Sequence, residues 1–384
     1  SMNGAGAEAR MHYAIVTDTC PASPGRAGET VELLHRGLRQ RGHRVSCVEP
    51  GQGTAARSHA PRAFWPRNRI PSLAGRRLME AWTRARPDAV YVATEGPLGW
   101  SAVHVARRLR LPVATDFHAW PDGRLQGADA CARLPSALAR LRRFHEQGDA
   151  TLVPTRVAWT ALHAAGFPRP CLLQRAVDPD HFHPCKRSPE LRAALGASPE
   201  APLLIHVGRL APGRNVRLAL QAYRVLRGSC PGARMVVAGD GPMRRGLERE
   251  FPECTFTGFL GRDALARLLA SADLCIQPCL DTIFGNVTLE AMASGVAVVA
   301  FDRGAAREHL VDGRQGVLVD PGDPFGFLAA TAELGGDLPR LRAMGVAARN
   351  AVRALSPQQM TAELDRLLAR ICMRHAWAGE GIAA

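Results

Sequence analysis

Short apolar runs alternate with amphipathic helical stretches along this chain, and that alternation restricts its fold more than any other feature. The runs have the length and composition of buried strands, and the stretches between them carry apolar residues at helical spacing. Expected strands are residues 12–18, 44–48, 89–93, 112–116 and 150–153, with helices at 29–41, 76–86, 99–108, 136–147 and 155–165. Each connecting helix returns the chain to the same edge of the sheet, so such strands pair in parallel. The first part of the chain is therefore predicted to be a doubly wound α/β domain.

A second series of the same kind follows a break at residues 175–184, which has prolines and no periodicity. Its expected strands are residues 202–207, 235–238, 254–257, 274–277, 297–300 and 316–319, and a last helix is expected at 358–371. We therefore expect two Rossmann-like α/β domains, at residues 11–180 and 181–355, and a C-terminal helix at 356–372. Two such domains in series predict a ligand cleft between them.

Composition and charge exclude some classes of protein. The chain has 384 residues, 46% of them apolar and 22% charged, which is typical of a globular protein. No apolar run reaches the roughly 18 residues of a membrane span. Lys186 is the single lysine, so the net charge of +14 comes from arginine. A GC-rich coding bias explains most of this arginine content. The functional explanations are binding to an anionic membrane surface or to diphosphate ligands. Nucleic-acid binding is disfavoured, because aromatic residues are only 5% and no groove-reading motif is present.

The ten cysteines form no C-x-x-C pairs at zinc spacing. Scattered thiols beside apolar residues indicate a reducing compartment, so we expect a cytoplasmic protein without a metal site.

Three loops of the second domain have the composition of ligand-binding loops. In the stretch 274–301, a loop with Gly285 leads from one apolar run into a short helix that carries Glu290, and then into another run; free N–H groups at such a helix start bind anions or sugar hydroxyls. Arg209 and Arg214 follow the first strand and suit a diphosphate, although two solvated arginines are the alternative. The turn at residues 238–242, Ala-Gly-Asp-Gly-Pro, is by itself a weak signal.

Residues 284–295, Phe-Gly-Asn-Val-Thr-Leu-Glu-Ala-Met-Ala-Ser-Gly, resemble the signature of the family 4 retaining glycosyltransferases. The resemblance implies a glycosyltransferase-B fold and transfer of a hexose from a nucleotide-sugar donor, without metal or cofactor. It also implies front-face attack, in which the leaving phosphate takes the proton of the acceptor hydroxyl. One family position departs: Thr282 stands where the family has a first Glu, and the neighbouring Asp281 is the candidate to replace it.

The resemblance assigns roles to individual residues. It places the diphosphate on Arg209 and Arg214, the nucleotide ribose on Glu290, and orientation of the donor sugar on His118. The remaining donor-binding positions that it implies are Gly25, Gly208, Gly239, Gly241, Thr282, Phe284, Gly285 and Asn286.

The first domain is expected to bind the acceptor, with Glu95, Arg142 and Arg143 facing it, and the last helix to cross back to brace that domain. The resemblance is strongest to bacterial enzymes of glycolipid synthesis, which implies GDP-mannose or UDP-glucose as donor and a lipid or glycan acceptor. The basic segment 57–77, with Phe64 and Trp65, is expected to bind the surface of an anionic membrane as a peripheral contact. Two alternatives stay open: a nucleotide-sugar-binding protein with impaired transfer, and a nucleotide-sugar epimerase.

Overall fold

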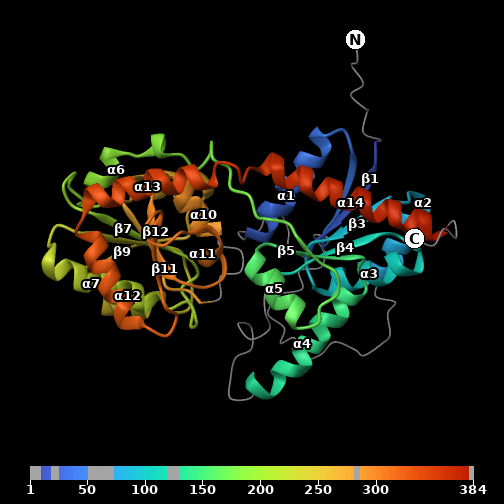
Figure 1. The fold of residues 1–384 in the computed structure, drawn as a ribbon, viewed down its shortest axis with the longest axis horizontal. Helices are drawn as coiled ribbons and strands as arrows, with labels where there is room; N and C mark the ends of the chain where they lie inside the picture. The colour runs from blue at the N-terminus through green and yellow to red at the C-terminus, as the bar shows by residue number, and fades with distance from the viewer. Residues whose placement is uncertain (1–9, 19–25, 51–72, 119–129, 281–285, 380–384) are drawn as a thin grey trace, which may run out of the picture. The chain divides into compact units, whose positions relative to one another are not determined.

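The computed structural model describes residues 10–18, 26–50, 73–118, 130–280 and 286–379. The chain divides into two compact units, each built on one six-stranded parallel sheet (Figure 1). Unit 1 contains the described residues up to Pro154, Trp159–Leu173 and those from Met360 onward, and unit 2 contains Thr155–Ala158 and Gln174–Gln359. Two parallel sheets flanked by helices are the fold class that the alternation predicted.

The sheet of unit 1 has the strand order β2-β1-β3-β4-β5-β6. Its strands are β1 His12–Val16, β2 Arg44–Val48, β3 Ala89–Val92, β4 Val113–Asp116, β5 Ala150–Val153 and β6 Pro170–Leu172. Its helices are α1 Arg26–Gln40, α2 Leu73–Arg84, α3 Pro97–Arg108, α4 Ala130–Glu146 and α5 Arg156–Ala164. The strand order reverses between β1 and β3, which is where open parallel sheets bind ligands, outside the carboxyl ends of the strands.

Burial explains why these segments become strands and helices. Every residue of β3, β4 and β5 is buried, as expected for central strands covered on both faces. Helix α3 turns Ala102, Val103 and Ala106 toward β1 and β3, where they join Trp82 of α2 in one apolar cluster. The helix period thus matches the face that it buries.

The last helix, α14, spans Pro357–Gly379 and is longer than the expected 358–371. Its Asp365 carboxylate accepts hydrogen bonds from the Tyr13 hydroxyl at 2.9 Å, Arg41 Nε at 2.7 Å and His43 Nε2 at 2.9 Å. Farther along, Cys372 donates a hydrogen bond to the carbonyl of Asp88 just before β3. Helix α14 is thereby attached to unit 1 along the edge at which β1 and β3 begin.

The sheet of unit 2 has the strand order β12-β11-β10-β7-β8-β9. Its strands are β7 Leu203–Val207, β8 Arg234–Ala238, β9 Thr255–Gly258, β10 Leu274–Gln277, β11 Ala297–Phe301 and β12 Gly316–Val319. Its helices are α6 Pro189–Ala194, α7 Val216–Ser229, α8 Arg244–Glu250, α9 Arg262–Ser271, α10 Asn286–Ala293, α11 Gly304–His309, α12 Pro324–Gly335 and α13 Leu338–Val352, and a 3-10 turn at Pro184–Lys186 precedes α6. The order reverses between β7 and β10, so the predicted ligand edge lies at the carboxyl ends of these two strands.

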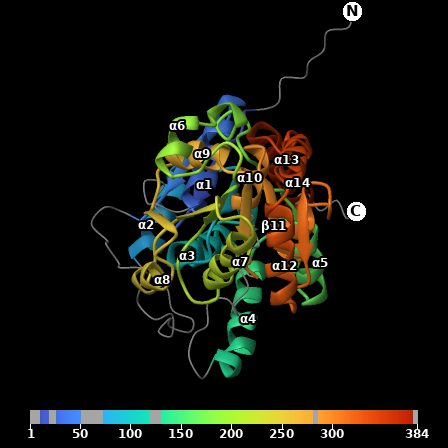
Figure 2. The ribbon, with the colours of Figure 1, turned by 90° about the vertical axis from the view of Figure 1, so that its left-hand side faces the viewer.

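Helices cover both faces of the second sheet. Helices α9 and α10 pack on the face formed by Ile205, Val236 and Val298. Helices α7 and α12 pack against each other on the opposite face (Figure 2), where Leu226 lies so close to Gly335 that a Cβ there would stand 2.5 Å from Leu226 Cδ2.

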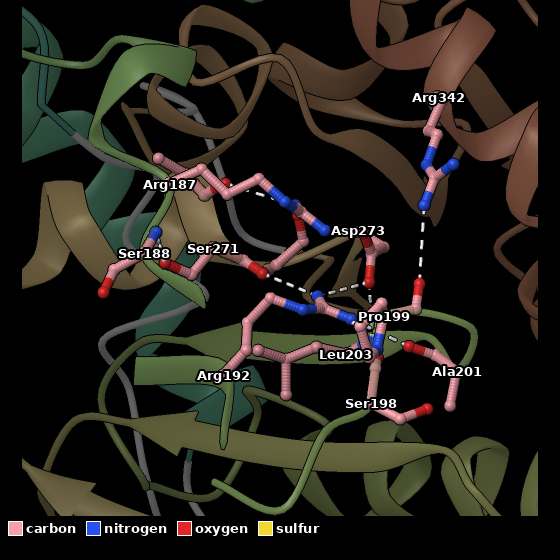
Figure 3. A network of polar contacts seen from close by, with 12 residues as sticks. Arg187, Ser188, Arg192, Ser198, Pro199, Ala201, Leu203, Ser271, Asp273 and Arg342 are labelled. Carbon is pink, nitrogen blue, oxygen red and sulfur yellow. Dashed lines mark hydrogen bonds and ion pairs between the residues drawn. The ribbon is translucent and has the colours of Figure 1, made fainter. Parts of the chain in front are cut away.

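An ionic network around the buried Asp273 stabilises the edge at which β7 and β10 begin (Figure 3). Asp273 accepts hydrogen bonds from Arg187 Nη2 and Arg192 Nη1, both at 2.7 Å, and from the backbone N–H of Leu203 at 2.8 Å. Arg192 also donates to the carbonyls of Ser198, Ala201 and Ser271. Because both oxygens of Asp273 and both Nη atoms of Arg192 have hydrogen-bond partners, the charges are tolerated in the interior. The network fixes one edge of the sheet and lies away from the edge that is predicted to bind ligands.

Candidate functional site

The loops after β7 and β10 meet where the strand order of unit 2 reverses. Arg214 Nη1 lies 3.2 Å from Cys279 Sγ, and Asn215 Nδ2 donates a hydrogen bond to the carbonyl of Pro278 at 3.0 Å. Asn215 has a left-handed backbone with φ of 51° and is directly followed by helix α7. The predicted diphosphate loop is therefore joined to the segment that leads toward Glu290.

The two arginines of this loop differ in exposure. The side chain of Arg209 is exposed, whereas that of Arg214 is half-buried beside Cys279, at the N-terminus of α7. A cation and the free N–H groups of a helix start act in the same direction on a bound anion. The arrangement can hold a diphosphate and neutralise its charge.

Three predicted donor-binding glycines lie where two backbones touch. A Cβ on Gly239 would stand 1.9 Å from the carbonyl oxygen of Gly208, and one on Gly241 would stand 2.3 Å from that of Leu210. Hydrogen bonds from Gly208 N to the Ala238 carbonyl and from Leu210 N to the Asp240 carbonyl join the two loops. Glycine is thus required at positions 239 and 241 for packing, and the packed turn supports the loop that carries Arg209.

A hollow of about 500 Å³ adjoins the same turn. It is lined by Asp240, Gly241, Pro242, Arg244, Arg245 and Glu248. Four of these six residues are charged, and Arg244 forms ion pairs there with Asp240 and Glu248.

Helix α10 places Asn286 in its first turn and Glu290 one turn later. The Glu290 side chain is buried, with 7% of the residue exposed, in a helix whose other residues from Thr288 to Ala293 are also buried. A buried carboxylate near a helix start fits a hydrogen-bonding role. Asp281, Thr282, Phe284 and Gly285, which carry the neighbouring predictions, lie outside the described residues, and so does Gly25.

In unit 1, Asp18 joins the loops after β1 and β3. Its carboxylate accepts hydrogen bonds from the Thr94 hydroxyl at 2.8 Å and from the N–H groups of Leu98 at 2.8 Å and Gly99 at 3.1 Å. It therefore caps the start of α3 and fixes the short loop that carries Glu95. Burial raises the pKa of Asp18 above its ordinary value, against these hydrogen bonds, which lower it. Sequence reasoning missed Asp18, although an acid directly after an apolar strand is a usable signal.

His118 follows β4 at the same edge as Glu95. Its Nε2 donates a hydrogen bond to the carbonyl of Ala93, directly after β3, and lies 3.8 Å from Asp116 Oδ2. That oxygen accepts from the Tyr91 hydroxyl at 2.7 Å. The hydrogen bond to Ala93 thus orients the ring.

Arg142 and Arg143 are not brought to Glu95 and His118. Both are exposed near the end of α4, and Arg142 Nη1 lies 3.7 Å from where a Cβ on Gly166 would stand, just after α5 ends. Helices in such folds run opposite to the strands, so helix ends lie at the edge where strands begin. These two arginines therefore lie toward the other edge of the sheet.

Among the residues that the structure describes, no three His, Cys, Asp or Glu side chains group as a metal site would require. Within the same residues, no helix is long and apolar enough to cross a membrane.

Comparison with known proteins decides the family. Residues 27–181 match the model described as Glycosyltransferase Family 4, and residues 201–337 match the model described as Glycosyl transferases group 1. A GDP-mannose-dependent alpha-mannosyltransferase of Mycolicibacterium smegmatis is 33% identical over 361 residues, covering 90% of this chain and 93% of the relative. This chain is a family 4 glycosyltransferase. The resemblance stated from residues 284–295 is confirmed.

Other proteins extend the comparison for this glycosyltransferase. The GDP-mannose-dependent alpha-mannosyltransferase of Mycobacterium tuberculosis is 31% identical, covering 82% of this chain and 85% of the relative. Sucrose-phosphate synthase from Thermosynechococcus elongatus has a TM-score of 0.75 at 19% identity, over 94% of this chain and 99% of that one. HepE of Anabaena, solved with UDP and glucose, has a TM-score of 0.71 at 18% identity, over 94% of this chain and 100% of that one. The last two show the glycosyltransferase-B fold. The chain is accordingly a hexosyltransferase that uses a nucleotide-sugar, in a retaining family.

Proposed function

We propose that this glycosyltransferase transfers mannose from GDP-mannose to a lipid acceptor at a membrane surface. The observation that carries the proposal is the 33% identity to a GDP-mannose-dependent alpha-mannosyltransferase over nine-tenths of both chains. A second relative, 31% identical over 56% of this chain and 61% of its own length, is named a GDP-mannose-dependent alpha-(1-6)-phosphatidylinositol monomannoside mannosyltransferase. Both names give the donor, and the second gives a lipid.

The loop after β7 supports binding of the donor diphosphate. Arg209 and Arg214 neutralise the charge that develops on the leaving phosphate as the bond to the sugar breaks, and such stabilisation is a large part of catalysis in general. Glu290 accepts hydrogen bonds from the ribose hydroxyls, and His118 orients the mannose. Asp281 stands in for the family's first Glu toward the sugar.

Transfer with retention then proceeds with little covalent chemistry from the protein. The acceptor oxygen forms its bond to the anomeric carbon on the face that the nucleotide leaves, and the carbon–oxygen bond to the diphosphate breaks. The hydroxyl proton passes to the leaving phosphate oxygen. Positioning and charge neutralisation are the contributions of the enzyme.

The membrane surface is proposed from the basic segment 57–77. Of its described part, Leu73 is 65% exposed at the start of α2, and Arg76 and Arg77 are exposed beside it. Arginines near an anionic surface each contribute about 1 kcal/mol, screened by salt. Sedimentation with vesicles of anionic and of neutral lipid tests this part: binding to anionic vesicles that salt reverses supports it, and equal binding to both contradicts it.

The reaction is tested by incubating the full chain with GDP-mannose, UDP-glucose or UDP-galactose, with and without an extract of bacterial membrane lipids. We expect GDP release that depends on the lipid, and a lipid product heavier by one hexose in mass spectrometry. Release of UDP from a UDP-sugar, with no release of GDP from GDP-mannose, would contradict GDP-mannose as the donor. Binding of GDP-mannose without release under any condition would favour the impaired binding protein, and conversion of the free nucleotide-sugar to an epimer would favour the epimerase.

A further inference from the structure

His206 is a buried histidine near the carboxyl end of β7, and none of the assigned roles uses it. It occupies the fourth position of β7, in an otherwise apolar strand, and only 2% of the residue is exposed. Its Nδ1 lies 2.9 Å from the carbonyl oxygen of Ile276 in β10. A carbonyl can only accept, so Nδ1 carries the proton and Nε2 of the neutral ring presents a lone pair.

The Nε2 atom lies close to Gly208. Among the described residues, Nε2 has no hydrogen-bond partner. A Cβ placed on Gly208 would stand 3.7 Å from Nε2, and no other described atom, apart from the glycine's chain neighbours, lies within 4 Å of that point. The described residues therefore leave room beside Gly208, and the buried Nε2 atom, which has no hydrogen-bond partner among them, lies at its margin.

The surroundings of this space favour an anion. Gly208 begins the loop that carries Arg209 and Arg214 and ends at the N-terminus of α7. A lone pair directed at a phosphate oxygen would be repelled, whereas a protonated imidazole donates a charge-assisted hydrogen bond to it. Burial lowers the pKa of His206 most; the hydrogen bond to the Ile276 carbonyl raises it by less, and the nearby Arg214 cation lowers it further, so the ring is neutral without a bound anion. A diphosphate brings negative charge to the same ring and reverses the balance.

We propose that His206 takes up one proton when the donor diphosphate enters the Gly208 loop, and then donates Nε2–H to a phosphate oxygen while Nδ1–H stays on Ile276. This inference rests on the proposed donor site and adds a residue to it. The proton comes from the buffer and returns to it when the nucleotide leaves. Donor affinity therefore falls as the pH rises above neutrality.

Calorimetric titration with GDP-mannose at pH 7.5, in two buffers of different ionisation enthalpy, measures the uptake directly. The phosphates of GDP-mannose are diesters without a titrating group near neutral pH, so a proton taken up belongs to the protein. We expect wild type to take up close to one proton per site, and its affinity to fall by up to about tenfold per pH unit above neutrality.

Three variants separate the contact from the titration. His206→Gln keeps a donor but cannot titrate, so it should bind with little loss and take up no proton. His206→Phe fills the strand position without a donor, and should bind about tenfold more weakly or worse, without uptake. His104→Gln removes an exposed histidine of α3 in unit 1 and should match wild type in both measurements.

Two results would overturn the inference while leaving the donor site standing: wild type that binds GDP-mannose without proton uptake, or uptake that persists in His206→Gln. If wild type binds neither GDP-mannose nor UDP-glucose, the proposed function fails, and this inference fails with it.

Discussion

Replacing Asp365 by alanine should destabilise unit 1 by about 3–5 kcal/mol, because the carboxylate is the common acceptor for three donors. Tyr13 is fully buried and His43 is 5% exposed, so each loses a hydrogen bond that water replaces poorly, at about 1–3 kcal/mol each. The Arg41 side chain is 30% exposed and recovers part of its loss in water. Burial alone would raise the pKa of Asp365, but hydrogen bonds from these three groups outweigh it and hold the pKa below its ordinary value. The stabilisation is therefore present above about pH 4 and is lost as the pH falls further.

Tryptophan fluorescence is a selective probe for this test. All six tryptophans of the chain belong by sequence to unit 1, and residues 174–359 contain none. In urea, the fluorescence midpoint of Asp365→Ala should fall by about 2 M, for a denaturant dependence near 2 kcal/mol per M. Arg366→Ala, which removes the next, exposed side chain of α14, should change stability by less than about 0.5 kcal/mol. A loss below about 1 kcal/mol in Asp365→Ala would refute the attachment of α14 through this carboxylate.

Three further outcomes are expected. The mannoside formed from GDP-α-mannose should have the α configuration, which the one-bond C–H coupling of the anomeric carbon reports in NMR. A β product would contradict transfer with retention. His145 is fully buried, hydrogen-bonded to Thr115 Oγ1 at 2.8 Å, and burial lowers its pKa to about 4, so the unfolded state binds its proton first as the pH falls from 6.5. When the pH is lowered from 7 to 5, the free energy of unfolding in urea should fall by about 2 kcal/mol less in His145→Gln than in wild type. Equal losses in the two proteins would show that His145 does not cause this pH dependence. Gly239→Ala should destabilise unit 2 by about 2 kcal/mol or more through the clash with Gly208 and so lower its melting temperature. Gly228→Ala, which has open space among the described residues around it in α7, should be neutral or stabilising. Equal effects of the two changes would contradict the close backbone approach.

The parallel sheets followed from the sequence because fully buried strands are apolar along their whole length and the helices between them are amphipathic. Strand β6 was missed, since Pro170–Leu172 is only three residues long and begins with proline. The end of α14 was missed because Met373 and Trp377 are exposed there and give no apolar period.

Motifs that follow a strand could be placed at the strand ends from the sequence, whereas side-chain contacts between distant loops could not. The sequence predicted a diphosphate role for Arg214 from its loop, and that role stays a prediction; its neighbour Cys279 is 65 positions away and is visible only in the fold. His206 and Asp18 were missed because a single polar residue near the end of an apolar run is common in strands and does not by itself indicate a functional role. Arg142 was placed with the acceptor from its charge alone, although its position near a helix end already separates it from the strand ends.

Binding of free nucleoside diphosphate tests the central claim, that the loop after β7 holds the donor diphosphate. We expect wild type to bind GDP in calorimetric titration, and the double variant Arg209→Ala/Arg214→Ala to bind it at least about 100-fold more weakly, since each charge-assisted contact contributes about 1.5–3 kcal/mol. Arg217→Ala/Arg227→Ala removes the same charge from the exposed side of α7 and should bind GDP as wild type does. Wild-type affinity for GDP in the Arg209→Ala/Arg214→Ala variant would contradict the account.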